Sequence, residues 1–380
     1  MKIKILQFYK NKWSESFPVE LDSENTWITV VSNSKRTDFT PLQDLKKHFA
    51  KSTLIGCSSA GEIFNDGVFD DSLSVSICMF EKTILRSIEV KINSSADSLA
   101  IGKSIGDTLN AKDLKAIFVL SDGLNINGTE LAMGINSKVN TSTKTVPVSG
   151  GLSGDGSDFK STFTLYGDVV STKQVVAVGF YGDKLTVGTG SVGGWDAFGA
   201  ARKVTKSKGN VLLELDGQPA LKLYKEYLGG QASKLPASAL LYPLSISYEQ
   251  RKDIVRTILA VDEKDQSLTF AGDIPEGSVA QLMKANFSRL VEGAESAGIA
   301  ASNFALKSTS AILALAVSCV GRRLVLGEKI EDETEAVIRI LPNNSKMIGF
   351  YSYGELSPNG NYGCELHNQT MTLTVFQEME

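Results

Sequence analysis

The hydrophobic pattern of the first half of the chain predicts strands that alternate with helices. Short apolar runs that end in small or polar residues predict strands at 27–33, 52–59, 72–80, 83–92 and 114–123, and antiparallel strands FTLYG and VVAVGFYG within 163–182. Apolar residues at helical spacing predict helices near 40–49, 96–109 and 128–138. Only Glu81 and Lys82 separate two of these strands, so we expect 72–80 and 83–92 to form a hairpin.

The second half of the chain shows the same mixture of predicted strands and helices. Hairpins are predicted at 203–217 and 255–273, and further strands at 310–321, 347–356 and 371–379. Helices are predicted after Pro219, around 287–294 and at 331–341. Because helices alternate with hairpins, we expect an α+β (mixed α/β) fold with two domains on mixed, largely antiparallel β-sheets flanked by helices.

A glycine-rich stretch at 188–199 is the candidate boundary between the domains. A chain of 380 residues is long for one domain, so we expect one domain over 1–193 and a second over 194–380. Gly188–Gly193 also matches the GxGxxG pattern of dinucleotide-binding proteins. That pattern requires a helix directly afterwards, and the following residues form helices poorly. We therefore interpret the stretch as a glycine-rich turn between domains.

Composition and charge narrow the classes of function. The net charge is −4, which argues against a broad nucleic-acid-binding surface. No apolar run is long enough to cross a membrane, and charges interrupt the N-terminal apolar residues, so we expect a cytoplasmic protein without a membrane contact. The 4 cysteines lack metal-ligand spacing and predict free thiols. The 2 histidines, His48 and His367, are the only imidazoles.

The densest group of chemically active side chains lies near the C-terminus, where polar residues follow predicted strands. The candidate ligand-binding residues are Cys319, Gly321, Arg322, Tyr353, Glu355, His367, Asn368 and Thr370. A guanidinium suits a ligand carboxylate or phosphate, and a carboxylate suits a ligand amine, so Arg322 and Glu355 are expected to be charged clamps. Tyr353 would form a wall, and His367 and Asn368 would orient the ligand. A buried hydrogen-bonded network explains the same residues equally well.

Several strings that span nearly the whole chain resemble the FIST sensory family, which pairs an N-terminal with a C-terminal FIST domain. They are LIGCSSAGEIF (54–64), VSGGLSGD (148–155), GWDAF (194–198), KVTKSKGNVLLELDGQPALKLYKEYLG (203–229), SLTFAGDIPEGS (267–278), SCVGRR (318–323), GFYSYGEL (349–356) and LHNQTM (366–371). No kinase, cyclase or methyl-accepting segment lies outside these strings. The resemblance therefore implies a stand-alone sensor that passes its signal to a separate protein.

The resemblance also implies a ligand and a partner. Members of the family bind small ligands, with amino acids as the proposed class. A bacterial subgroup of similar architecture binds haem, senses nitric oxide and regulates histidine kinases. Haem needs an axial ligand, for which His367 is the best candidate because His48 lies on a polar helix face. The leading hypothesis is a ligand-binding sensor, in which the ligand shifts the arrangement of the domains. The alternative is a haem-bound nitric oxide sensor.

Two other classes of function remain open. A hydrolase or transferase could use Cys319 or Ser318 with His367, but no catalytic signature accompanies these residues, so we do not expect an enzyme. The other open class is a scaffold protein whose two domains only bind partner proteins. The signalling partner expected for the sensor is a protein such as a histidine kinase.

Overall fold

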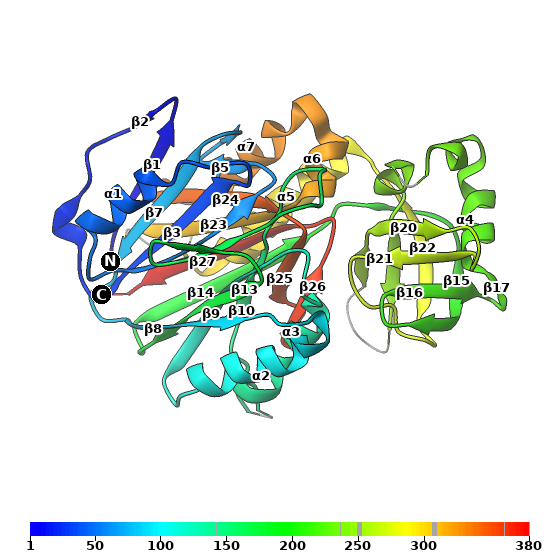
Figure 1. The fold of residues 1–380 in the computed structure, drawn as a ribbon, viewed down its shortest axis with the longest axis horizontal. Helices are drawn as coiled ribbons and strands as arrows, with labels where there is room; N and C mark the ends of the chain where they lie inside the picture. The colour runs from blue at the N-terminus through cyan, green and yellow to red at the C-terminus, as the bar shows by residue number, and fades with distance from the viewer. Residues whose placement is uncertain (142, 236, 249–252, 306–309, 361, 380) are drawn as a thin grey trace.

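Strands from both halves of the chain share sheets. The computed structural model describes residues 1–380 apart from 142, 236, 249–252, 306–309, 361 and 380. Residues 196–284 form a separate lobe, which we call the small domain, and the rest form the body (Figure 1). The fold is α+β with mixed, mostly antiparallel sheets, so the predicted fold class is confirmed.

The described residues of the body form three sheets. The first has the order β12 (Val169–Ser171), β11 (Thr164–Tyr166), β4 (Thr53–Ser59), β3 (Thr26–Asn33), β7 (Leu73–Met79), β1 (Lys2–Tyr9) and β2 (Lys12–Trp13). The second has the order β26 (Cys364–His367), β25 (Gly354–Pro358), β10 (Val148–Leu152), β9 (Leu114–Ser121), β13 (Gln174–Tyr181) and β8 (Ile84–Lys91). The third has the order β14 (Leu185–Val192), β27 (Met371–Glu378), β23 (Ile312–Cys319), β24 (Ser345–Ser352), β5 (Glu62–Phe64) and β6 (Gly67–Phe69).

The pairings β10–β25, β14–β27 and β5–β24 join strands from before and after residue 193. The body is therefore completed by the C-terminal strands of the chain. The division of the sequence into units at 1–193 and 194–380 stays a prediction.

An aromatic cluster joins the three sheets of the body. Trp27 of β3 lies with its ring 5.3 Å from Phe118 of β9 and 5.2 Å from Phe376 of β27, centroid to centroid. Phe180 of β13 lies 4.9 Å from the same indole. All four side chains are buried. Each edge-to-face pair adds to the stability gained by burying these large apolar surfaces, so the sheets share one core.

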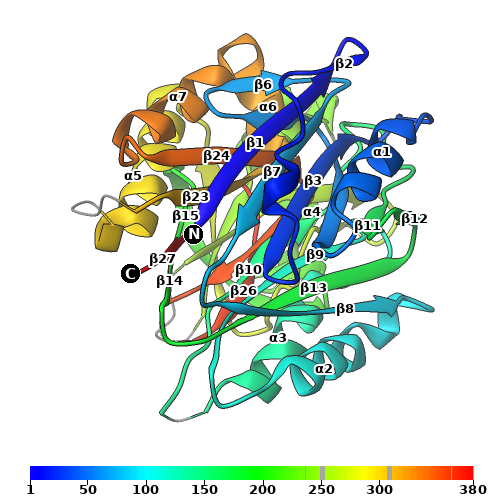
Figure 2. The same cartoon turned by 90° about the vertical axis from the view of Figure 1, so that its left-hand side faces the viewer.

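Helices cover the outer faces of the body. The helices are α1 (Thr40–His48), α2 (Ser98–Leu109), α3 (Gly128–Val139), α5 (Phe287–Ser302), α6 (Val320–Leu326) and α7 (Glu331–Ile340), with short turns of 3-10 helix at Val19–Leu21, Ser95–Asp97, Asn303–Ala305 and Gly327–Lys329. Figure 2 shows α2 and α3 side by side on one side of the body and α5 and α7 on another. All the helices predicted for the body are confirmed. Sequence analysis missed α6, which starts directly after β23.

The interpretation of 188–192 as a turn is wrong, because these residues lie in β14. A Cβ added at Gly188 would come within 2.0 Å of the carbonyl oxygen of Ala301, and one added at Gly190 within 2.1 Å of that of Ala297. The two glycines therefore allow α5 to pack directly on the strand. Only Gly193 and the residues after it form the link to the small domain.

The hairpin expected at 72–92 is also wrong, although both strands exist. β7 pairs with β1 and β3, whereas β8 pairs with β13 in another sheet. The chain crosses between the sheets at 81–83, where the Glu378 carboxylate accepts hydrogen bonds from the N–H groups of Glu81, Lys82 and Thr83. Glu378 thus stabilises a connection between two sheets at 81–83 in place of a hairpin turn.

The described part of the small domain consists of antiparallel strands, one α-helix and short 3-10 turns. Its elements are β15 (Asp196–Lys208), β16 (Val211–Leu215), β17 (Gln218–Pro219), α4 (Ala220–Leu228), β18 (Leu244–Ser247), β19 (Ile254–Arg256), β20 (Ile258–Asp262), β21 (Ser267–Phe270) and β22 (Val279–Lys284), with 3-10 turns at Gly229–Lys234 and Ala237–Leu241. The hairpins β15–β16 and β20–β21 and helix α4 confirm the predictions. Two chain segments, 193–196 and 284–287, connect this domain to the body.

Candidate functional site

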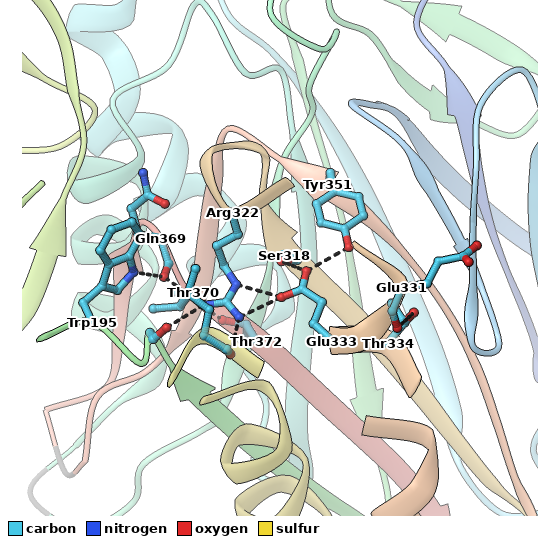
Figure 3. A network of polar contacts seen from close by, with 12 residues as sticks. Trp195, Ser318, Arg322, Glu331, Glu333, Thr334, Tyr351, Gln369, Thr370 and Thr372 are labelled. Atoms are coloured by element: carbon cyan, nitrogen blue, oxygen red, sulfur yellow. Dashed lines mark hydrogen bonds and ion pairs between the residues drawn. The ribbon is translucent and has the colours of Figure 1, made fainter. Parts of the chain in front are cut away.

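The candidate residues near the C-terminus fall into three groups. Arg322, on the first turns of α6, forms a network with Glu333 of α7 (Figure 3). Glu355 and His367 lie opposite each other on β25 and β26. Tyr353 lies between β24 and β25, where the chain changes sheet. The predicted strand at 347–356 is therefore two strands in different sheets.

The guanidinium of Arg322 is fully buried, and contacts within the protein engage all its nitrogen atoms. Nε and Nη2 donate to Oε2 of Glu333 at 2.9 and 2.7 Å. Nη1 donates to the carbonyl oxygen of Gly193 at 2.5 Å, and Nη2 donates to that of Leu290 at 2.7 Å. Ser318 and Tyr351 donate to the other oxygen of Glu333 at 3.0 and 2.8 Å. The contacts match the buried-network interpretation of Arg322 and give no support to a ligand clamp.

This network holds the first connection to the small domain. Gly193 and Trp195 belong to that connection, and the indole N–H of Trp195 donates to the carbonyl oxygen of Gln369 at 2.9 Å. Trp195 and Ala285, one from each connection, also pack on the apolar cluster of Leu290, Val325 and Leu326. Arg322 therefore fixes the segment from which the small domain extends.

Glu355 is fully buried among hydroxyl groups. Ser352 donates to Oε1 at 2.7 Å, and Thr370 donates to Oε2 through its hydroxyl at 2.9 Å and its N–H at 3.2 Å. Burial raises the pKa of the Glu355 carboxyl to about 8, although these bonds and the charge of Arg322 oppose the change. A carboxyl that is largely protonated at neutral pH does not support the expected anionic clamp.

Two neighbouring amides are buried without hydrogen-bond partners among the described residues. Both amide atoms of Asn368 and of Gln369 are in this position, and both side chains are 0% exposed. A Cβ added at Gly321 would come within 2.4 Å of Nε2 of Gln369, so this glycine makes room for the amide. The prediction that Asn368 orients a ligand stays a prediction.

Tyr353 holds a loop that follows β10. Its hydroxyl donates to the Asp155 carboxylate, and its ring stacks on Phe159 with a centroid distance of 4.4 Å. The same carboxylate accepts the N–H groups of Phe159, Lys160 and Ser161. Burial alone would raise the pKa of Asp155, but these hydrogen bonds lower it. Tyr353 thus anchors the 155–161 loop, and its role as a wall of a ligand site stays a prediction.

The residues around His367 do not fit a haem site. The residue is 7% exposed, and its Nε2 is 3.2 Å from the carbonyl oxygen of Ser357 on the neighbouring strand. His367 does not line the five best-formed cavities between described residues. Asn368 and Thr370, which follow it, are polar and buried, whereas haem requires a largely apolar pocket beside its ligand. No step is therefore assigned to haem. The described residues also contain no group of three or more potential metal ligands.

Cys319 does not have the environment of a nucleophile. Burial raises the pKa of its thiol, and the neighbouring Glu355 raises it further. The reactive form of cysteine is the thiolate, so a thiol that stays protonated is inert. The other candidate nucleophile, Ser318, donates to Glu333.

A cavity at the seam between the small domain and the body is the site that sequence analysis missed. It has a volume of about 100 Å³. Its lining residues are Thr129, Met133, Cys364, Glu365 and Leu366 from the body and Ile246, Tyr248, Ile254, Arg256, Asp273 and Pro275 from the small domain. The one sequence signal was Arg256, a charged residue inside the apolar run VRTILAV.

Arg256 links the two walls of this cavity. Its side chain is 4% exposed. Nε donates to the carbonyl oxygen of Asp273 at 3.2 Å in its own domain, and Nη1 donates to that of Leu366 at 2.7 Å in the body. Asn127 of the body also donates to the Asp273 carboxylate at 3.1 Å. The cavity is therefore bounded by hydrogen bonds that cross the seam.

Comparison with known proteins places the chain in a family. The model of the FIST N domain matches residues 27–218 and that of the FIST C domain matches 220–358. The chain belongs to the FIST family, whose domains are associated with sensory signalling and small-ligand binding.

A curated relative, an uncharacterized protein of Methanocaldococcus jannaschii, is 26% identical over 353 residues. The similarity covers 82% of this chain but 65% of that protein, so the chain spans less than two thirds of the relative's length. Among the described residues, no helix is both long and apolar enough to cross a bilayer.

Proposed function

We propose that the protein is a sensor that binds a small ligand in the seam cavity. The observation that carries this proposal is that the small domain and the body supply opposite walls of one cavity. A ligand that fits only one arrangement of the two walls stabilises that arrangement. The relative position of the small domain and the body then reports whether ligand is bound.

The connections between the two parts suit this mechanism. The first connection is held by Arg322 and Trp195 on the body, and the seam itself is closed by the contact of Arg256 with Leu366. We propose that the Arg322 network is a fixed pivot and that the seam contacts change with ligand. A differential affinity of about 1–3 kcal/mol between the two arrangements is enough for signalling.

The signal would pass to a separate protein such as a histidine kinase, in the cytoplasm. All four cysteines are free and buried, which suits a reducing compartment. The alternative of a haem-bound nitric oxide sensor has no support in the contacts of His367. An absorption spectrum of protein expressed with haem supply tests it, since a Soret band that is altered in His367→Ala would establish haem binding.

The experiment for the proposed function is small-angle X-ray scattering of the full chain during titration with a metabolite mixture. The expected result is a change in the distance distribution that the variant Ile254→Trp, which fills the cavity, abolishes. Binding that leaves the scattering unchanged would contradict the mechanism. Binding that survives in Ile254→Trp would place the ligand elsewhere.

A further inference from the structure

We propose that the ligand of the seam cavity is a small carboxylate that carries an apolar group, and that Arg256 holds its carboxylate. This inference rests on the proposed function, because it takes the seam cavity as the ligand site. It adds the chemical class of the ligand and the residue that selects it.

The first argument is the charge of Arg256. Among the described residues its guanidinium has two acceptors, the carbonyl oxygens of Asp273 and Leu366, and both are neutral. No carboxylate of the described residues forms an ion pair with it within 4.0 Å. A buried charge without a partner of opposite charge is costly, whereas a planar fork of N–H donors matches a carboxylate. The cavity therefore presents an unpaired cation to its contents.

The nearby acidic side chains act on Arg256 only through their charge, since none of the described ones forms an ion pair with its guanidinium. Their carboxyl groups accept hydrogen bonds from other residues: Asp273 from Asn127, Glu355 from Ser352 and Thr370, and Glu365 from Asn359 at 2.6 Å. Burial lowers the pKa of Arg256 to about 10, although the charges of Glu365 and Asp273 oppose this. The guanidinium thus stays charged at neutral pH while its desolvation is only partly compensated.

The second argument is the apolar lining. Met133 and Leu366 of the body face Ile246, Ile254 and Pro275 of the small domain across the cavity. A volume of about 100 Å³ accommodates on the order of seven non-hydrogen atoms, at about 15 Å³ for each water-sized site. Arg256 is the only cation among the described lining residues, which also include the carboxylates of Asp273 and Glu365. A guanidinium with an unused N–H edge and an apolar wall together select a short acid with an alkyl or similar substituent.

The test is calorimetric titration of the full chain with 3-methylbutanoate as the probe. Its neutral isostere, 3-methylbutanamide, has the same shape without the charge. We expect the acid to bind at least tenfold more tightly than the amide, because charge-assisted hydrogen bonds to Arg256 are lost with the amide. This comparison uses the unmodified protein and so does not depend on the folding of a variant.

Arg256→Met removes the cation and is expected to weaken acid binding at least tenfold. The matched control is Arg202→Met, since Arg202 lies in β15 of the same domain, partly exposed, and pairs with Asp216 at the surface. It should leave the affinity unchanged within about twofold. Equal binding of acid and amide, no heat from the acid at millimolar concentration, or full affinity in folded Arg256→Met would each overturn the proposal.

The outcomes separate this inference from the proposed function. Equal binding of acid and amide, both lost in Ile254→Trp, would keep the cavity as ligand site and remove the carboxylate. Tight binding of the acid without a change in scattering would keep the carboxylate site and remove the proposed mechanism. Leucine as a third probe identifies the source: tighter binding than the plain acid assigns a free amino acid, and weaker binding assigns an unsubstituted short acid.

Discussion

Nη1 of Arg256 in the small domain donates a hydrogen bond of 2.7 Å to the carbonyl oxygen of Leu366 in the body, and both residues are buried. Because this buried cation binds both lobes, an anion that pairs with it can change how the two lobes are arranged. The hydrogen bonds of Arg256 at the seam and those of Arg322 at the pivot therefore have different functions. The guanidinium of Arg256 is open to a ligand, whereas that of Arg322 is saturated by protein acceptors.

Gly272 is predicted to be required for the seam contact. A Cβ at this position would come within 2.9 Å of Nε of Arg256 and 3.0 Å of Cδ2 of Leu366. Gly272→Ala should therefore displace the guanidinium and weaken the binding of 3-methylbutanoate about tenfold, with little loss of stability. Calorimetry measures the first and thermal unfolding the second. Gly230→Ala is a control for substitution of a glycine in the same domain, since Gly230 has no positive φ and no atom lies within 4 Å of its added Cβ. Unchanged affinity in Gly272→Ala would show that the position of Arg256 does not matter.

The ion pair of Arg322 and Glu333 is predicted to be structural. Both side chains are 0% exposed, so removal of one partner leaves an uncompensated buried charge. Arg322→Met should lower the free energy of unfolding by about 3–5 kcal/mol in urea titrations. The double variant with Glu333→Leu should recover part of that loss. The exposed pair of Arg289 and Asp196 is the control, where Arg289→Ala should cost below about 1 kcal/mol. A loss that small in Arg322→Met would contradict the buried network.

The carboxyl of Glu355 predicts a pH dependence of stability. Burial raises its pKa from 4.5 to about 8 in the folded protein. Its contribution to stability is therefore fully present below about pH 4.5 and is lost as the pH rises through 8. Relative to Glu355→Gln, which does not titrate, the native protein should lose on the order of a few kcal/mol over this range.

Urea unfolding of the two proteins, measured at roughly every pH unit between pH 5 and 9, checks this prediction. Glu62 is also buried, and burial raises its pKa to about 7, but it is present in both proteins and its contribution cancels in the difference. Parallel stability curves for the two proteins would contradict the assignment to Glu355.

Gly194 is predicted to be essential at the pivot. It has a φ of 74°, and an added Cβ would come within 1.9 Å of the carbonyl oxygen of Arg289 in α5. Gly194→Ala should cost about 1–3 kcal/mol in backbone strain, plus the displacement of α5. Gly217→Ala provides the matched control, because Gly217 has a φ of 75° and no atom within 4 Å of its added Cβ. Equal costs in urea unfolding would show that backbone strain alone accounts for the effect.

The elements with local causes were predictable from the sequence. Helix α4 ends at Gly229 and the β15–β16 hairpin turns through Gly209, as the pattern indicated. The failures have distant causes. The strands at 72–92 separate because Glu378, almost 300 residues later, binds the turn between them. Gly188 and Gly190 lie in a strand because a helix packs on them, which no local pattern reveals.

The same distinction applies to the candidate site. The polar residues near the C-terminus were found by their chemistry, but their partners Glu333, Gly193 and Leu290 come from other elements. The seam cavity was missed because Arg256 resembles an exposed strand position until the small domain is placed against β26. Sequence alone predicted which side chains are special and could not predict which of them are already paired.

The most direct test of the account is the distance between the two lobes with and without ligand. Cysteines introduced at the exposed positions Lys222 of α4 and Lys103 of α2 can carry spin labels, since all four native cysteines are buried. Pulsed electron–electron resonance should show that saturating 3-methylbutanoate shifts the distance distribution, that 3-methylbutanamide at the same concentration does not, and that Arg256→Met abolishes the shift. An identical distribution with and without the bound acid would contradict the claim that the seam cavity couples ligand to domain arrangement.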